Sequence, residues 1–175
     1  MKSRLLIRIW VLLLVCGIYF SCKKDTSSPA PTSVVPSAPA PTMSANVGGN
    51  MESFSPYIIF DSFGMNLIGN HSVGALQYQI QICGVKTLPN YVGTYKLYYW
   101  TGGVYSATAG TGFSEQFNYN TDTNHSGIFS ITSYNAQLNT ISGTFSFLAN
   151  QTYPRADSGK YTINVTNGVF SNLKL

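Results

Sequence analysis

The chain has 175 residues, of which 44% are hydrophobic and only 9% are charged, and its formal net charge is +4. This composition excludes a disordered polyelectrolyte and predicts one packed domain. The positive charge does not indicate a nucleic-acid partner. Lys2, Arg4 and Arg8 account for most of it, and from Thr42 onward five acidic residues balance five basic ones.

The first 21 residues have the three parts of a cleavable signal peptide. A basic start ends at Arg8, an apolar run follows from Ile9 to Phe20, and the small residue Ser21 precedes Cys22. A membrane-spanning helix needs about 20 apolar residues, and this run is much shorter. We therefore predict that residues 1–21 are removed.

Cys22 is the predicted lipid anchor. The segment Ser21-Cys22-Lys23-Lys24-Asp25 resembles the lipoprotein cleavage sites of Bacteroidetes, in which the cysteine is acylated and becomes the mature N-terminus. Acyl chains contribute about 0.8 kcal/mol per buried methylene, so more than one chain anchors a protein stably. The expected location is the bacterial cell envelope, at the outer membrane, with the membrane as a partner. Cys16 as the anchor, or secretion without a lipid, are the alternatives.

Residues 22–41 form a predicted tether, because they contain five prolines together with Ser, Thr, Ala and Val. Such segments adopt extended polyproline II structure and hold a domain away from its anchor. A ligand for a proline-recognition domain is the alternative interpretation. The composition changes at Thr42, so we expect the folded domain to comprise residues 42–175.

Beyond Thr42, apolar and polar residues alternate in short runs separated by Gly, Asn and Pro, which is typical of antiparallel strands. The clearest runs are 76–82, 141–149 and 161–166. No amphipathic helix pattern is present. We predict an all-β fold, an antiparallel β sandwich of about nine strands, with an up-and-down β barrel as the alternative.

Two β hairpins are predicted. Asn167-Gly168 favours a type I′ turn between strands at 160–166 and 169–175, and residues 127–133 are expected to pair with 141–149 through a longer loop.

Three segments in order, Gly127–Ser133, Ile141–Ala149 (ISGTFSFLA) and Val165–Phe170 (VTNGVF), resemble a family of Bacteroidetes lipoproteins whose C-terminal β domain has no assigned function. Residues 43–49 and 93–97 resemble the family's opening strand and its central G-T-Y-x-L strand. The resemblance covers most of residues 42–175. It implies a location and a fold class, and it supplies no catalytic residue.

The sequence predicts no enzyme, no metal site and no cofactor, because it contains no recognisable catalytic, metal-binding or phosphate-binding motif. His71, after Gly69-Asn70, is interpreted as a turn residue. Residues 122–127 imitate the start of a calcium loop but lack its acidic twelfth position, so a polar loop is expected, with a weak metal site as the alternative. Cys83 is interpreted as a structural residue, with a reactive or metal-binding thiol as the alternative.

Tyr98 and Trp100 are the predicted ligand-binding residues. If Tyr95 and Leu97 face the core, alternation places Tyr98 and Trp100 on the outer side. Exposed aromatic rings offer a platform for a sugar. A covering loop, or a bulge that shifts the register after Leu97, is the alternative.

Two functions remain in consideration at this point, with an enzyme as a distant third. The first is a cell-envelope binding or accessory lipoprotein whose ligand is a glycan or an envelope protein. The second is a carrier that encloses a small apolar ligand in a barrel.

We expect mass spectrometry of the purified protein to find an acylated Cys22 at the mature N-terminus. Cys22→Ala should release the protein from the membrane fraction. Membrane retention of that variant, or an unmodified N-terminus, would contradict the assignment.

Overall fold

The computed structural model describes residues 37, 39–86, 91–98, 102–109, 115–153 and 161–175. The strands lie in one compact unit, Ser37–Leu175. They are β1 (Thr42–Val47), β2 (Asn50–Asp61), β3 (Gly64–Val73), β4 (Leu76–Val85), β5 (Gly93–Leu97), β6 (Gly103–Ala109), β7 (Glu115–Asn120), β8 (Gly127–Asn135), β9 (Thr140–Tyr153) and β10 (Thr162–Lys174).

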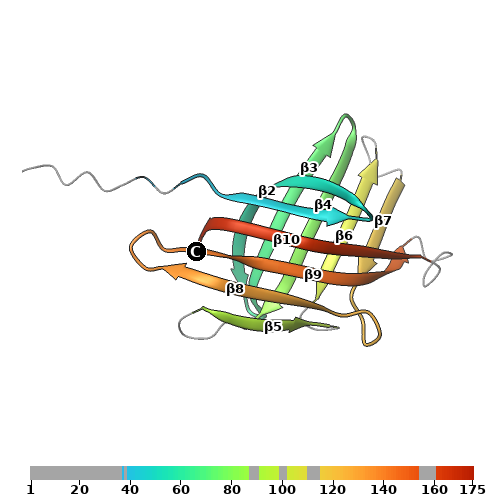
Figure 1. Ribbon diagram of the computed structural model, residues 1–175. Coiled ribbons are helices and arrows are strands. Elements are labelled where there is room, and N and C mark those ends of the chain that lie inside the picture. The colour runs from blue at the N-terminus through green and yellow to red at the C-terminus, as the bar shows by residue number, and fades with distance from the viewer. Residues whose placement is uncertain (1–36, 38, 87–90, 99–101, 110–114, 154–160) are drawn as a thin grey trace, which may run out of the picture. The chain divides into compact units, whose positions relative to one another are not determined.

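Eight of these strands form a closed antiparallel β barrel. The ring runs β10-β1-β2-β3-β4-β6-β7-β9, and it closes because β9 also pairs with β10. In Figure 1, β3, β4, β6 and β7 run steeply across the layer that contains β1, β10 and β9. The predicted all-β fold is confirmed, and of the two predicted arrangements the structure has the barrel.

Strand β9 pairs with two different strands along one of its edges, so the sheet divides there. Its first part, Thr140–Phe147, pairs with β8, and its last part, Asn150–Tyr153, pairs with β7. The short strand β5 pairs with the outer edge of β8. Leu97 of β5 and Phe129 of β8 are both fully buried, so the two strands outside the ring pack on the same hydrophobic core.

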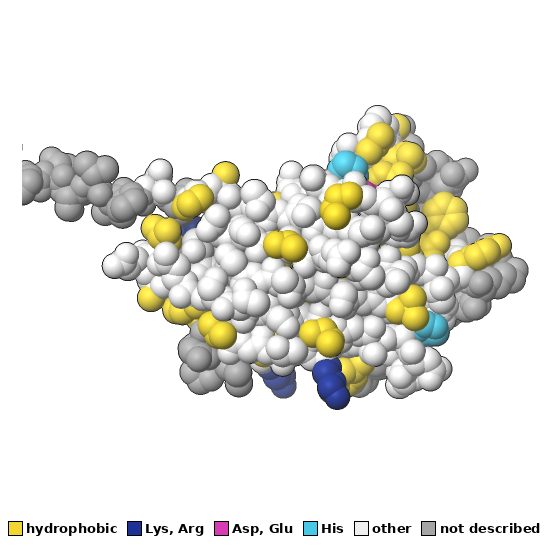
Figure 2. All heavy atoms as spheres, in the orientation of Figure 1, with side chains coloured by type: hydrophobic (Ala, Val, Ile, Leu, Met, Phe, Trp, Pro, Cys, Tyr) yellow, Lys and Arg dark blue, Asp and Glu magenta, His cyan; other side chains and the backbone are white. Residues whose placement is uncertain are grey.

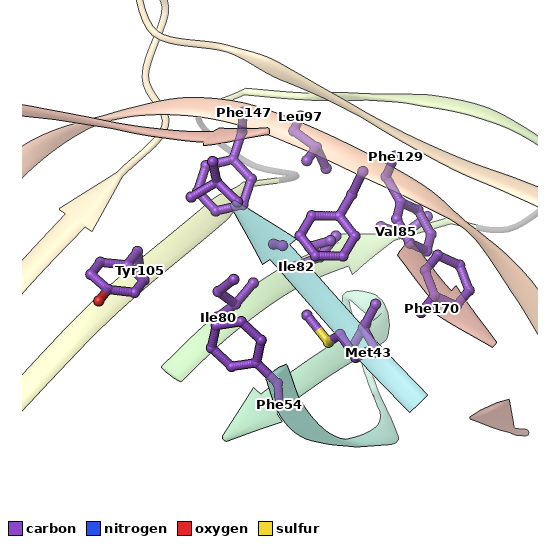
Figure 3. Close-up of a cluster of buried hydrophobic side chains, with 14 of the residues drawn as sticks. Met43, Phe54, Ile80, Ile82, Val85, Leu97, Tyr105, Phe129, Phe147 and Phe170 are labelled. Atoms are coloured by element: carbon purple, nitrogen blue, oxygen red, sulfur yellow. The ribbon is translucent and has the colours of Figure 1, made fainter. Parts of the chain in front are cut away.

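The alternation predicted for β4 and β9 is confirmed. Ile80 and Ile82 of β4 are fully buried, as are the inward residues of β9, and they meet Phe54, Phe129 and Phe170 in the interior (Figure 3). The rings of Phe129 and Phe170 stack with centroids 5.3 Å apart. Burial of these side chains is the main favourable term that holds the barrel together.

The hairpin predicted at Asn167-Gly168 is wrong, whereas the one between β8 and β9 is confirmed. Asn167 has the positive φ of 51° that a type I′ turn needs, but β10 continues past it, because both neighbouring strands do. The register shifts there, which makes the dipeptide a β bulge. A Cβ atom on Gly168 would lie 2.5 Å from the ring of Phe145, so the bulge also brings the backbone onto the core.

One detail of the β10 prediction is also wrong. The sequence predicted alternation from Tyr161 to residue 166, but the strand begins at Thr162 and Tyr161 is 58% exposed. Alternation does not show at which residue a strand begins or ends, which is why the start of β10 was predicted one residue too early.

We expect Ile82→Ala to lower the free energy of unfolding by about 2–5 kcal/mol, because it empties a fully buried site in the barrel. Ile128→Ala makes the same chemical change at a position that is 50% exposed, and it should lower the free energy by less than about 1 kcal/mol. Urea denaturation of the two variants provides the comparison. Equal losses would show that the interior is not packed as described.

Candidate functional site

The inner wall of the barrel changes from apolar to polar at one end. This end carries the β1–β2 turn at Gly48-Gly49 and the β3–β4 turn at Gly74-Ala75. The inward positions here belong to five neighbouring strands of the ring and to β9. We call the following side chains the polar cluster: Glu52, His71, Tyr78, Tyr105, Tyr119 and Gln151.

Strand pairing explains why these side chains share one face. Glu52 lies opposite Ala45, whose side chain is fully buried, and His71 lies opposite Tyr78. Tyr119 lies opposite both Tyr105 and Gln151. Directly paired residues of antiparallel strands point to the same side of the sheet, so all of them face the interior.

Aromatic rings form a continuous series across this end, one from each of β2, β3, β4, β6 and β7. The centroids are 5.8 Å apart from Phe54 to His71 and 5.8 Å from His71 to Tyr78. They are 6.3 Å apart from Tyr78 to Tyr105 and 6.1 Å from Tyr105 to Tyr119. In Figure 3, the hydroxyl oxygen of Tyr105 points away from the aliphatic core. Four of these five rings belong to the polar cluster, so the series marks the boundary between the apolar core and the polar end of the barrel.

Two acceptor atoms of the polar cluster have no hydrogen-bond partner in the described part of the chain. They are Oε2 of Glu52 and Oε1 of Gln151, and both are shielded from solvent. Gln151 is only 1% exposed, and its Nε2 donates to the backbone oxygen of Tyr153 at 3.2 Å. A buried acceptor without a partner costs about 1–3 kcal/mol, so such atoms are uncommon in folded proteins. They mark this end as a candidate binding site.

Burial perturbs two titratable groups of the polar cluster. It raises the pKa of the Glu52 carboxyl, and the charge of His71 opposes part of that rise. It also raises the pKa of the Tyr105 hydroxyl, an effect that Glu52, Tyr78 and Tyr119 reinforce. Partial burial and the neighbouring charged or polar groups therefore shift the pKa values of both groups upward.

Beyond the polar cluster, this end of the barrel carries large apolar side chains that are 39% to 58% exposed. Figure 2 shows hydrophobic side chains gathered over the end of the β3–β4 hairpin, whereas the face over β10 and β9 carries isolated ones. Exposed apolar groups at a barrel mouth are typical of ligand entry. We call these residues the apolar rim: Val73, Leu76, Phe117, Tyr153 and Tyr161.

The predicted surface site is described only in part. Tyr98 is 49% exposed, and the alternation that leads to it is as predicted, since Leu97 is fully buried and Thr94 is exposed. Trp100 and the predicted anchor Cys22 lie outside the described residues. The ligand role of Tyr98 and Trp100 stays a prediction.

The interpretation of His71 as a turn residue is wrong. It lies inside β3, half-buried between the rings of Phe54 and Tyr78, because the turn that follows Gly69-Asn70 comes only at Gly74. Glu52 and Gln151 were missed altogether. The signal for both was a polar residue on the inward row of a strand, two positions from Phe54 and from Ala149 respectively.

The Asp122–Gly127 segment is the polar loop that the sequence predicted. The Asp122 carboxylate accepts hydrogen bonds from the backbone amides of Asn124 and His125 at 2.7 Å, and it lies 2.8 Å from Nδ1 of His125. Burial acts to raise the pKa of Asp122, but the hydrogen bond with His125 and the two amides outweigh it, so the pKa is lowered. Within the described residues, no three His, Cys, Asp or Glu side chains are grouped to hold a metal ion.

Cys83 lies near the end of β4 beside a pocket of about 420 Å³ on the far side of the barrel from the polar cluster. Burial raises the pKa of its thiol to about 11, and Asp61 adds to the rise. At neutral pH it is therefore a protonated and weakly nucleophilic thiol.

In the described residues, no helix has the length and apolar character needed to cross a bilayer.

Glu52→Gln is expected to stabilise the ligand-free protein at neutral pH. Because the pKa of Glu52 is raised in the folded state, its ionisation disfavours folding as the pH rises through that value. The variant should unfold roughly 1–2 °C above the parent at pH 7.5, a small gain because solvent screens a half-buried carboxylate.

At pH 4, where the carboxyl is mostly protonated in both states, the two melting temperatures should converge. Thermal unfolding followed by circular dichroism measures both values. A Glu52→Gln variant that is less stable than the parent at pH 7.5 would show that the carboxylate already has a favourable partner.

Comparison with known proteins gives one match. A family model described as "Domain of unknown function (DUF6252)" matches residues 74–174. No curated protein and no solved structure matches the chain. The matched segment begins at the β3–β4 turn and ends with β10, so it contains Tyr78, Tyr105, Tyr119 and Gln151 of the polar cluster. Since it spans more than half of the chain, this protein belongs to the DUF6252 family.

Proposed function

We propose that this chain is a cell-envelope lipoprotein whose barrel binds a small amphipathic ligand at the end that carries the polar cluster. The observation that supports the proposal best is the pair of shielded, unpaired acceptors on the inner wall, Glu52 Oε2 and Gln151 Oε1. A ligand that donates hydrogen bonds to both atoms removes an unfavourable term from the folded protein. Residues of this kind lower stability and are retained where they serve binding.

The apolar rim supports the same proposal from the outer side of the site. Its side chains are exposed at the same end of the barrel, so the apolar part of a ligand can pack on them while its polar end reaches Glu52 and Gln151. Closed β barrels commonly hold ligands at their mouths in this way. Transport or sequestration of the ligand, without covalent change, is the function we infer.

Acylation of Cys22 belongs to this proposal. A lipid at Cys22 and a proline-rich tether up to Pro41 would hold the barrel near a membrane, where amphipathic molecules concentrate. The combination suits a carrier that takes such molecules from the envelope and releases them there.

A second candidate function is glycan or envelope-protein binding on the outer surface at Tyr98. The observation in its favour is the exposed ring of Tyr98, 49% accessible, on the outer side of β5. Loss of glycan binding in Tyr98→Ala, with binding at the barrel end unchanged, would support this function as a separate activity.

The carrier function is tested with a panel of small amphiphiles that share one apolar group and differ in head group. A ligand at 100 times its Kd adds about 2.7 kcal/mol to stability, which raises the melting temperature by several degrees. Gln151→Leu removes an inner acceptor at similar volume and should abolish that rise.

Gln77→Leu is the matched control, because Gln77 is exposed on the outer wall of β4. It should leave the ligand-induced rise unchanged. If no amphiphile stabilises the protein, or if both variants respond like the parent, the barrel end is not the binding site.

A further inference from the structure

We infer that the ligand at the polar cluster carries an ammonium group with N–H donors, that is, a protonated amine attached to an apolar body. This inference rests on the proposed function and names the chemical class of its ligand. It comes from three independent properties of the site: its acidic side chain, its unpaired hydrogen-bond acceptors, and its aromatic walls.

The inner wall at this end of the barrel contains a carboxylate. Among the described inward-facing residues there, Glu52 is the one acidic side chain, His71 is the one basic side chain, and the described lysines Lys86, Lys96 and Lys174 are exposed residues of other regions. The Glu52 carboxylate repels a carboxylate or phosphate head group. A cation would be attracted.

The polar cluster offers unpaired hydrogen-bond acceptors to a ligand. In the described part of the chain, the polar cluster has two shielded atoms without a partner, on Glu52 and on Gln151, and both are acceptors. The Gln151 donor is already engaged with the backbone oxygen of Tyr153. An ammonium group is all donor, so it matches this pattern better than an ether, ketone or ester, which can only accept.

The walls of the site are the faces and edges of aromatic rings. The rings of Tyr78 and Tyr105 are nearly parallel, with an interplanar angle of 22° and centroids 6.3 Å apart, and Tyr119 follows at 6.1 Å. Cations are attracted to such ring faces, and aromatic groups combined with a carboxylate are the usual recognition elements for ammonium ligands. Glu52 lies on the inward row of β2, two positions from Phe54, which is the first ring of the series, so the carboxylate and the rings line the same end of the barrel.

The test compares two probes of nearly equal shape, phenethylammonium and 2-phenylethanol, by isothermal titration calorimetry at pH 7.5 on the purified mature protein. We expect the ammonium to bind at least about tenfold more tightly than the alcohol. Glu52→Gln should weaken binding of the ammonium by about tenfold and change the affinity for the alcohol by less than about twofold. Asp61→Asn removes the same charge at the opposite end of the barrel and should change neither.

Equal affinities of the two probes, or an ammonium affinity that Glu52→Gln leaves unchanged, would overturn the ammonium inference while Gln151→Leu still tests the site. Tighter binding of the alcohol would assign a neutral hydroxylated ligand instead. If neither probe binds but other amphiphiles do so in a manner that depends on Gln151, the ligand class is wrong and the proposed function stands. Absence of binding by every amphiphile would overturn both.

Discussion

The pairing of β10 with β9 is the constraint on which the rest of the structure depends. It joins the two ends of the ring of strands, so every inward residue of eight strands faces one shared interior. Without this joint, the sheet would present two long edges to solvent and its apolar rows would have no common core. The fork in β9 follows from the same joint, because one strand must pair with β10 along most of its length and divide its other edge between β7 and β8.

Closure of the barrel also determines the environment of an inward-facing polar residue. On an open sheet, a glutamate such as Glu52 could turn to water, but on the inner wall of a barrel it competes with packed neighbours for a small volume. The folded protein carries a carboxylate and an amide there without hydrogen-bond partners for two of their oxygens. The stability of the barrel comes from the core around Phe129 and Phe170, so the domain tolerates this local loss at its mouth.

Much of this fold is predictable from the sequence, since alternation identifies strands such as β4 and β9 together with their buried faces. Alternation carries no information on which strands become neighbours, so it could not decide between a sandwich and a barrel. Asn167-Gly168 has the backbone conformation of a turn, but the pairings on both sides of β10 make it a bulge. The candidate site was missed because Glu52 and Gln151 are 99 positions apart in the sequence and face one shared interior only because the barrel closes.

The pairing of β1 with β10 has a consequence for the order of folding. Most ring neighbours are adjacent or nearly adjacent in the chain, but these two strands are the first and the last, and their contacts have the largest sequence separation in the domain. Such contacts form late, because the intervening chain must lose its freedom first. The ring of strands cannot close until β10 is available, because β10 is the strand that joins β1 to β9.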